Sequence, residues 1–363
     1  TVDENNENYK SIDGVLYNKE VTKLIQYPTS CEAESYIVPE TVTEIGADAV
    51  SFCYYLKNIT LPDALETIGN RAFYASSITE MDIPDKVATI DEATFSGCSK
   101  LETLILPESL TFIGNSAFEK CKKLTTITIP AETQYIGDNA FKECSALKEI
   151  FVPSKVTHIG DNAFFKCYSL TTATISDSVK TMGKAVFQGC QSLVNVTLPC
   201  DITEITSAMF NNCESLKTVV IPEKVKTINN SAFAYSNGLT SITIPNSVEV
   251  IGTEAFGFCE NLTTVNFGNG LKEIGQIAFS NCYNLNGVTL PNSLEKISKS
   301  AFEHCISMES INIPENVNTI ENYAFHNCNK LRTIDVAENN KTYSSVDGVL
   351  FNKEQTALLI SQW

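Results

Sequence analysis

One segment recurs along almost the whole chain and limits what the chain can fold into. Residues 136–158 read IGDNAFKECSALKEIFVPSKVTH, and residues 159–181 read IGDNAFFKCYSLTTATISDSVKT. The first position of this unit occurs thirteen times, in steps of 23 residues except for the second step, which is 22. A fixed period of this size indicates a solenoid, in which each repeat is stabilised by its neighbours and no single core is needed. These frame positions are Ile45, Ile68, Ile90, Ile113, Ile136, Ile159, Met182, Ile205, Ile228, Ile251, Ile274, Ile297 and Ile320.

Each repeat predicts one short strand. In residues 124–130, Ile127 and Ile129 alternate with threonines, so one face of the strand should be buried and the other solvated. Pro130 ends the strand because proline has no N–H to donate to a neighbouring strand. The sequence therefore predicts a stack of parallel strands, one from each coil.

The segment after the frame isoleucine predicts a turn followed by a single helical turn. The glycine at the second position, present in eight copies, suits a turn that needs a positive φ. Asp138 and Asn139 are residue types that cap a helix. Ala140, Phe141 and Cys144 have the spacing that would place them on one inner face of a helical turn.

The two ends of the chain carry a second, shared motif. YKSIDGVLYNKEVTKLI at residues 9–25 resembles YSSVDGVLFNKEQTALLI at residues 343–360. The Asp-Gly turn between apolar runs predicts a β-hairpin in each place. The expected organisation is an N-terminal hairpin cap with a half repeat at 1–44, thirteen repeats at 45–335 and a C-terminal hairpin cap at 336–363. The hairpins are interpreted either as plain caps or as the borders of one block from a longer tandem array.

The repeat resembles the BspA-like class of leucine-rich repeats, a family of bacterial and protist surface proteins. The residues that carry the resemblance are the Ile-Gly-x-x-Ala-Phe-x-x-Cys-x-x-Leu blocks and the Asp-Gly-Val-Leu-Tyr/Phe-Asn-Lys motifs at the ends. The resemblance implies a right-handed α/β solenoid of short parallel strands and single helical (3-10 or α) turns, a cell-surface location, and adhesion or ligand binding. The copy at Ile68 departs from the pattern, because it lacks one residue and has Ser76 and Ile78 where Cys and Leu are expected, so we expect an irregular coil there.

Charge and hydropathy exclude several classes of partner. The 363 residues carry a net charge of −17, which disfavours nucleic acid and anionic membrane surfaces. No apolar run reaches the roughly 20 residues of a membrane span. No signal peptide stands at Thr1, and we expect that one has been removed from a secreted or cell-surface protein that is monomeric.

Most of the cysteines occupy one position of the repeat. A metal or redox role is disfavoured because Cys-x-x-Cys is absent and ligands spaced along a spine do not close a tetrahedron. Disulfides between neighbouring coils remain an alternative, although the total of 13 is odd. The favoured interpretation is a ladder of reduced, buried thiols behind the turn, with Cys31 and Cys200 outside it. The ladder cysteines are Cys53, Cys98, Cys121, Cys144, Cys167, Cys190, Cys213, Cys259, Cys282, Cys305 and Cys328.

No catalytic motif stands out. The three histidines, His158, His304 and His326, do not form a nucleophile–base pattern, and phosphate-binding loops and zinc-protease motifs are absent. His304 and His326 lie on adjacent coils and form at most a weak metal pair. We therefore expect no enzyme activity, no cofactor and no metal.

The solvent-facing strand position is the candidate ligand face. Most copies have a small polar residue there, whereas Ile105, Phe151 and Val220 are large and apolar. An exposed aromatic side chain on a preformed, concave sheet would contact a partner, although single exposed apolar residues on strands are common. The resulting prediction is non-catalytic recognition of a protein or glycan on a host or neighbouring cell. The alternative is a structural spacer or stalk of a larger surface protein.

Overall fold

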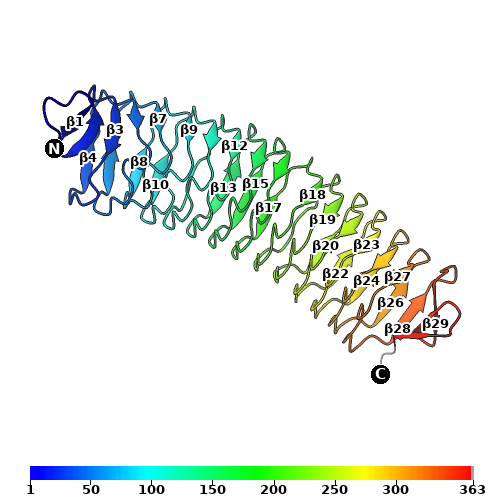
Figure 1. Cartoon of the computed structure of the whole chain (residues 1–363). Coiled ribbons are helices and arrows are strands. Elements are labelled where there is room, and N and C mark those ends of the chain that lie inside the picture. Colours follow the sequence, from blue (N-terminus) through cyan, green and yellow to red (C-terminus); the bar gives the residue numbers. More distant parts are fainter. Residues whose placement is uncertain (361–363) are drawn as a thin grey trace. The chain divides into compact units, whose positions relative to one another are not determined.

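The structure, a computed structural model, describes residues 1–360. These residues form short strands joined by turns, without any helix, and therefore without a helix that is long and apolar enough to span a bilayer. They divide into two compact units, Thr1–Cys190 and the part from Gln191 onward, each built of stacked coils (Figure 1). The predicted parallel-strand solenoid is confirmed in each unit.

Most coils contribute two strands, one more than the sequence predicts. The strand expected at residues 124–130 does not form, although Ile127 and Ile129 are buried as predicted, and the strand expected near Val220 is reduced to a single bridge. In the coil that begins at Ile136, the expected strand spans Glu149–Val152, with Ile150 and Val152 buried and Phe151 exposed. A second strand of two residues, Tyr135–Ile136, ends at the frame isoleucine. The strands of each kind pair in parallel with those of the next coil, 23 residues along the chain.

The first unit contains an antiparallel hairpin followed by two parallel ladders, each of which is interrupted once. The hairpin strands are β1 (Tyr9–Ile12), β2 (Val15–Asn18) and β3 (Lys23–Gln26). The strands with the solvent-facing position are β4 (Ser35–Ile37), β6 (Asn58–Thr60), β8 (Glu80–Asp82), β10 (Thr103–Ile105), β13 (Glu149–Val152) and β15 (Thr172–Ile175). The frame strands are β5 (Glu44–Ile45), β7 (Thr67–Ile68), β9 (Thr89–Ile90), β11 (Phe112–Ile113), β12 (Tyr135–Ile136), β14 (His158–Ile159) and β16 (Thr181–Met182). The interruptions lie between β7 and β9 and between β10 and β13. Strand β3 joins the hairpin to the frame ladder by pairing in parallel with β5.

The second unit has the same two ladders and ends in a hairpin. Its frame strands are β18 (Glu204–Ile205), β19 (Thr227–Ile228), β21 (Val250–Ile251), β23 (Glu273–Ile274), β25 (Lys296–Ile297) and β27 (Thr319–Ile320). The other ladder comprises β17 (Asn195–Thr197), β20 (Ser241–Thr243), β22 (Thr264–Asn266), β24 (Gly287–Thr289), β26 (Ser310–Ile313) and β28 (Thr333–Val336). The terminal strands are β29 (Tyr343–Val346), β30 (Val349–Asn352) and β31 (Leu358–Ile360). Both predicted hairpins are therefore present.

Phenylalanine rings form the centre of each unit. Within each unit the rings are fully buried, and the rings of consecutive coils stack in parallel. In the first unit the centroid distances are 5.2 Å for Phe73–Phe95, 5.6 Å for Phe95–Phe118, 5.1 Å for Phe118–Phe141, 5.4 Å for Phe141–Phe164 and 5.6 Å for Phe164–Phe187. In the second unit, five stacked pairs from Phe210–Phe233 to Phe302–Phe325 lie 5.0–5.7 Å apart. Stacking gives the rings inside each unit two neighbours that a single coil could not supply.

The segment predicted as a helical turn consists of consecutive β-turns. The N–H groups of Ala140 and Cys144 donate to the carbonyl oxygens three residues earlier, of Gly137 and Phe141. The N–H group of Lys142 also donates within the coil, to Asn139 O, whereas those of Phe141 and Glu143 leave the coil and donate to Ala163 O at 2.8 Å and Phe165 O at 2.7 Å in the next coil. A helix would use all of these donors internally. The inward spacing of alanine, phenylalanine and cysteine is the same in both geometries, which explains why the sequence prediction was wrong.

Asp138, one of the residues predicted as a helix cap, connects coils instead, as do its counterparts in the neighbouring repeats. Asn115 Oδ1 accepts the N–H of Asp138, Asp138 Oδ1 accepts that of Asp161, and Asp161 Oδ1 accepts that of Lys184. Each bond spans one repeat and is 2.7–2.9 Å long. The side chain that follows the frame glycine therefore helps to join consecutive coils.

The prediction that the frame glycine has a positive φ was also wrong. The left-handed residues are the fourth and eighth of each repeat, such as Asn139 (φ 56°) and Glu143 (φ 59°), where type II turns place them. In the coils that have a frame glycine, close packing between coils explains it. A Cβ atom added to Gly160 would lie 2.4 Å from the backbone nitrogen of Asp138.

The 22-residue coil is irregular, as predicted. Strands β6 and β8 pair through a single register position, Asn58 with Glu80, whereas β8 and β10 pair through three. The missing residue falls in the turn between Ser76 and Ile78, and Ile78 is still fully buried in the core. The deletion therefore perturbs the strand ladder but leaves the core continuous.

Candidate ligand-binding face

Two of the three predicted face residues lie in the first unit, on the solvent side of their strands. Ile105 ends β10 and is 56% exposed, and Phe151 lies in the middle of β13 and is 59% exposed. Their chain neighbours Leu104 and Ile150 are buried. The predicted inside–outside alternation is therefore confirmed for both strands.

The third predicted residue, Val220, belongs to the second unit. It is 82% exposed and lies outside the strands, two residues after Thr218, which forms an isolated bridge with Asn195. Other residues at this position in the second unit are small and polar, namely Thr243, Asn266, Thr289 and Asn312. Val220 is thus an isolated apolar residue in a polar row.

Ile37 occupies the same position and was missed by the sequence analysis. It ends β4, is 72% exposed and pairs in register with Thr60 of β6. The signal was available, because Ile37 lies one period before Thr60. It was overlooked because residues 1–44 were assigned to a cap.

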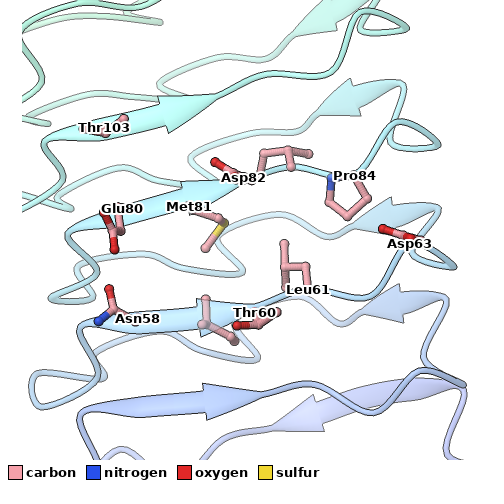
Figure 2. Close-up of a pocket in the computed structure, with 11 residues that line it drawn as sticks. Asn58, Thr60, Leu61, Asp63, Glu80, Met81, Asp82, Pro84 and Thr103 are labelled. Atoms are coloured by element: carbon pink, nitrogen blue, oxygen red, sulfur yellow. The ribbon is translucent and has the colours of Figure 1, made fainter.

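A hollow lies on this face where the irregular coil separates two strands. Its volume is about 540 Å³, and its wall includes Thr60 of β6 and Glu80 and Asp82 of β8. Figure 2 shows Asn58 and Thr60 on one strand and the side chains of Glu80, Met81 and Asp82 on the next. Asp82 is also in register with Ile105. The hollow therefore presents carboxylate and amide groups next to an exposed apolar side chain.

A second, smaller hollow of about 220 Å³ adjoins Phe151. Thr128 of the preceding coil, Thr174 of the following coil and Glu149 of the same strand contribute to its wall. The aromatic ring therefore lies beside hydroxyl and carboxylate groups and the edges of three isoleucines, on a strand that pairs in parallel with β15. Such a surface can offer one apolar contact and several hydrogen bonds to a partner.

The cysteine ladder is buried, as predicted, and its thiols also donate hydrogen bonds. In most coils the thiol donates to the backbone oxygen of the phenylalanine in the preceding coil, as Cys98 does to Phe73 O at 3.0 Å. Cys53 differs, because its thiol donates to Ser51 O at 3.6 Å. Ser236 occupies the same position and donates from its Oγ atom to Phe210 O at 2.7 Å, so the position selects a small donor. The Sγ–O distances are 3.2 Å for Cys121–Phe95, 3.1 Å for Cys144–Phe118, 3.2 Å for Cys167–Phe141, 3.1 Å for Cys190–Phe164, 3.1 Å for Cys259–Phe233, 3.2 Å for Cys282–Phe256, 3.2 Å for Cys305–Phe279 and 3.1 Å for Cys328–Phe302.

Burial keeps these thiols protonated. Desolvation raises the pKa of Cys98 to about 11 and that of Cys190 to about 12, from an ordinary value of 9.0. The thiolate is the reactive form, so the ladder is chemically inert at neutral pH. Outside the ladder, Cys31 is half-buried and Cys200 is exposed.

The histidines make local contacts. His158 stacks on Tyr135 at 4.8 Å and shares a 2.7 Å hydrogen bond with Thr181. His326 Nδ1 lies 3.2 Å from Glu303 Oε1, and His304 Nε2 lies 3.2 Å from Asn327 Nδ2. Within residues 1–360 no three potential ligands come close enough together to hold a metal ion.

Comparison with known proteins identifies the repeat. The profile of a BspA type leucine-rich repeat region of six copies matches residues 27–134, 111–240 and 226–352. A leucine-rich repeat protein from Bacteroides ovatus is 26% identical, with 93% of this chain and 94% of that chain covered and a TM-score of 0.60. A leucine-rich cell surface protein from Faecalibacterium prausnitzii is 25% identical, with 91% and 94% covered and a TM-score of 0.52. No protein with a curated description matches. Because the profile covers most of the repeats, this chain belongs to the BspA type leucine-rich repeat family.

Proposed function

We propose that this chain is a non-catalytic recognition module that binds a protein through the strand face of its first unit. The observation that carries the proposal is Phe151, which is 59% exposed beside a hollow lined by threonine, glutamate and isoleucine. Aromatic residues contribute strongly to protein interfaces because they offer a large contact area and lose little conformational entropy on binding. Ile105, two coils away, would add a second apolar contact.

The location proposed for this function is the cell surface or the extracellular medium. The Faecalibacterium prausnitzii protein of similar structure is described as a cell surface protein. The net charge of −17 supports a protein partner rather than a nucleic acid or an anionic membrane. The matching family is one of structural repeats, and no catalytic family is indicated.

The test is a binding screen with matched variants. The chain would be probed against purified extracellular matrix proteins and, in a separate arm, against a glycan array. Phe151→Ser combined with Ile105→Thr should weaken binding to a protein hit at least about tenfold, because apolar contact area is lost. The melting temperature should change little, since both side chains are already exposed.

Tyr168→Ser provides the control. Tyr168 is a 41% exposed aromatic residue of the same unit that lies in a turn rather than on the strand face. Its substitution should leave the affinity unchanged. Equal loss with Tyr168→Ser, or no loss with the double variant, would contradict the proposal, and hits confined to the glycan array would reassign the ligand class.

A spacer role is the second candidate, and one observation favours it for the second unit. Its strand face is a row of small polar residues, with Val220 as the apolar exception. Such a uniform face offers no anchor for a partner. Under this alternative the binding screen would give no hit for the chain and Val220→Thr would be silent in every assay.

A further inference from the structure

The two terminal hairpins are the same structure formed twice. Residues 334 positions apart correspond, and the same three backbone positions have a positive φ in each copy. Each hairpin has a register shift at the same place in its central strand, before Tyr17 in one copy and before Phe351 in the other. The corresponding positive-φ residues are Asp13 and Asp347, Gly14 and Gly348, and Val21 and Gln355.

The side-chain hydrogen bonds are repeated as well. Asn18 Nδ2 donates to Glu20 and Thr22, and Asn352 Nδ2 donates to Glu354 and Thr356. The Nζ atom of Lys19 donates to Glu4 O, and that of Lys353 donates to Glu338 O. Val2 N and Val336 N both donate to a serine Oγ atom nine residues later. The hairpins are therefore equivalent in their internal structure.

One face of the hairpin is covered in the N-terminal copy and open in the C-terminal copy. In the first unit, β3 pairs in parallel with β5, and Tyr17 and Leu24 are completely buried under the following coil. Their counterparts in the C-terminal copy are more exposed to solvent. Phe351 is half-buried and Leu358 is 54% exposed.

The opposite face shows the reverse pattern. In the second unit the hairpin packs on the preceding coil, where Ile334 N donates to Gly348 O at 3.0 Å, and Tyr343 and Leu350 are buried. The counterpart Tyr9 is 47% exposed, and Leu16 is half-buried. The N-terminal hairpin therefore packs one face on a coil, and the C-terminal hairpin packs the opposite face on a coil.

We propose that the hairpin is a two-sided connector and that the open face of the C-terminal copy docks one further coil of the same repeat type. This C-terminal face consists of Val349, Phe351 and Leu358. The docked coil would pair a frame strand in parallel with β31, as Glu44 and Ile45 of β5 pair with Lys23 and Leu24 of β3. The N-terminus of a second copy of this chain cannot supply the docked coil. The first coil of that copy is already covered by its own N-terminal hairpin.

The experiment uses the whole described chain with an extension. Residues 27–134 are fused directly after Ile360, because Ile360 corresponds to Gln26 and Tyr27 would then follow in register. The readout is the labelling rate of the appended copies of Cys53, Cys98 and Cys121, which are buried in the first unit. If the hairpin docks the appended coils, labelling should be at least about a hundredfold slower than in urea, because access then requires local unfolding.

Leu358→Asp in the extended chain is the decisive control. In the extended chain this substitution should return the appended Cys53 to fast labelling. In the chain without the extension it should barely change the urea midpoint, because Leu358 is exposed there. Leu24→Asp, at the covered counterpart, should lower the midpoint clearly. Fast labelling of the extension without the substitution, or equally slow labelling with Leu358→Asp, would overturn the proposal.

Discussion

At the scale of single residues, the cysteine ladder acts through hydrogen bonding as well as packing. The backbone oxygen of Phe118 accepts two donors, Cys121 N at 3.1 Å from its own coil and Cys144 Sγ at 3.1 Å from the next. A carbonyl with two acceptor sites in a dry core benefits from both partners. The sequence predicted the burial of Cys144 correctly but could not show which atom its thiol faces.

Substitution of Cys144 separates the two roles. Cys144→Ser should cost no more than about 1 kcal/mol of unfolding free energy, because the hydroxyl keeps the bond to Phe118 O. Cys144→Val should cost about 2–3 kcal/mol, because it leaves that oxygen with one donor fewer and adds bulk. Urea denaturation measures both variants. A valine variant more stable than the serine variant would show that the position selects only for small apolar volume.

The frame glycines give a second residue-scale prediction. Gly160→Ala should destabilise the protein by roughly 2–4 kcal/mol, since the new Cβ would lie 2.4 Å from Asp138 N and the coils would have to separate. Gly287→Ala is the matched control, because its Cβ would meet no atom closer than 3.6 Å. Thermal unfolding should show a large decrease for the first variant and little change for the second. Equal effects would mean that close approach between coils is not what selects glycine.

At the scale of the element, alternating strands were predictable and turns were not. Ile150, Phe151 and Val152 follow a period of two, which can be read directly because burial switches at every residue. The frame strands escaped prediction because a strand of two residues contains no period. The turn at Ala140 and Phe141 was assigned to a helix because inward spacing alone cannot tell which N–H groups are bonded to the next coil.

The stacked phenylalanine ladder supplies the element-scale prediction. Phe164→Ala should cost about 3–5 kcal/mol, because the ring is fully buried between Phe141 and Phe187. Since a coil contacts its immediate neighbours, the loss should be greatest nearby. Hydrogen exchange should therefore quicken most in the coils around residue 164. A uniform increase across the first unit would indicate that the unit unfolds as one block.

At the scale of the whole molecule, the buried thiols predict sensitivity to alkali. Unfolded thiols ionise near pH 9, whereas burial holds the pKa of Cys98 near 11 and those of Cys190 and Cys259 near 12. The unfolded state therefore binds fewer protons above pH 9, so this stability is complete below pH 9 and is lost as the pH rises towards 12. At pH 10 the loss should be about 1 kcal/mol per buried thiol, which over many coils rivals the total stability of a typical domain.

Urea denaturation at pH 7, 9 and 10 measures this effect. A variant with serine at positions 121, 144 and 167 is the control, because a hydroxyl does not ionise in this range. It should lose less stability between pH 7 and pH 10 than the parent chain does. A parent chain with the same unfolding free energy at pH 7 and pH 10 would refute the prediction.

The candidate face was predictable in part. The exposure of Ile105 and Phe151 follows from the repeat register alone. The hollow at Thr60 and Asp82 does not, because it arises from how a 22-residue coil displaces one strand from the next. The position of Ile37 could have been inferred by extending the period backwards by one step.

The bonds between coils also determine how a unit would respond to mechanical force. The N–H groups of Asn139, Phe141 and Glu143 all donate to the following coil, so the links between coils lie along the direction in which coils stack. Tension applied at the two ends of a unit would load these links one coil after another rather than all together. Each rupture would release one repeat of 23 residues. In a single-molecule pulling trace this would give a sawtooth with steps of about 80 Å in contour length. Such a chain could therefore lengthen under shear while most of its coils stay folded.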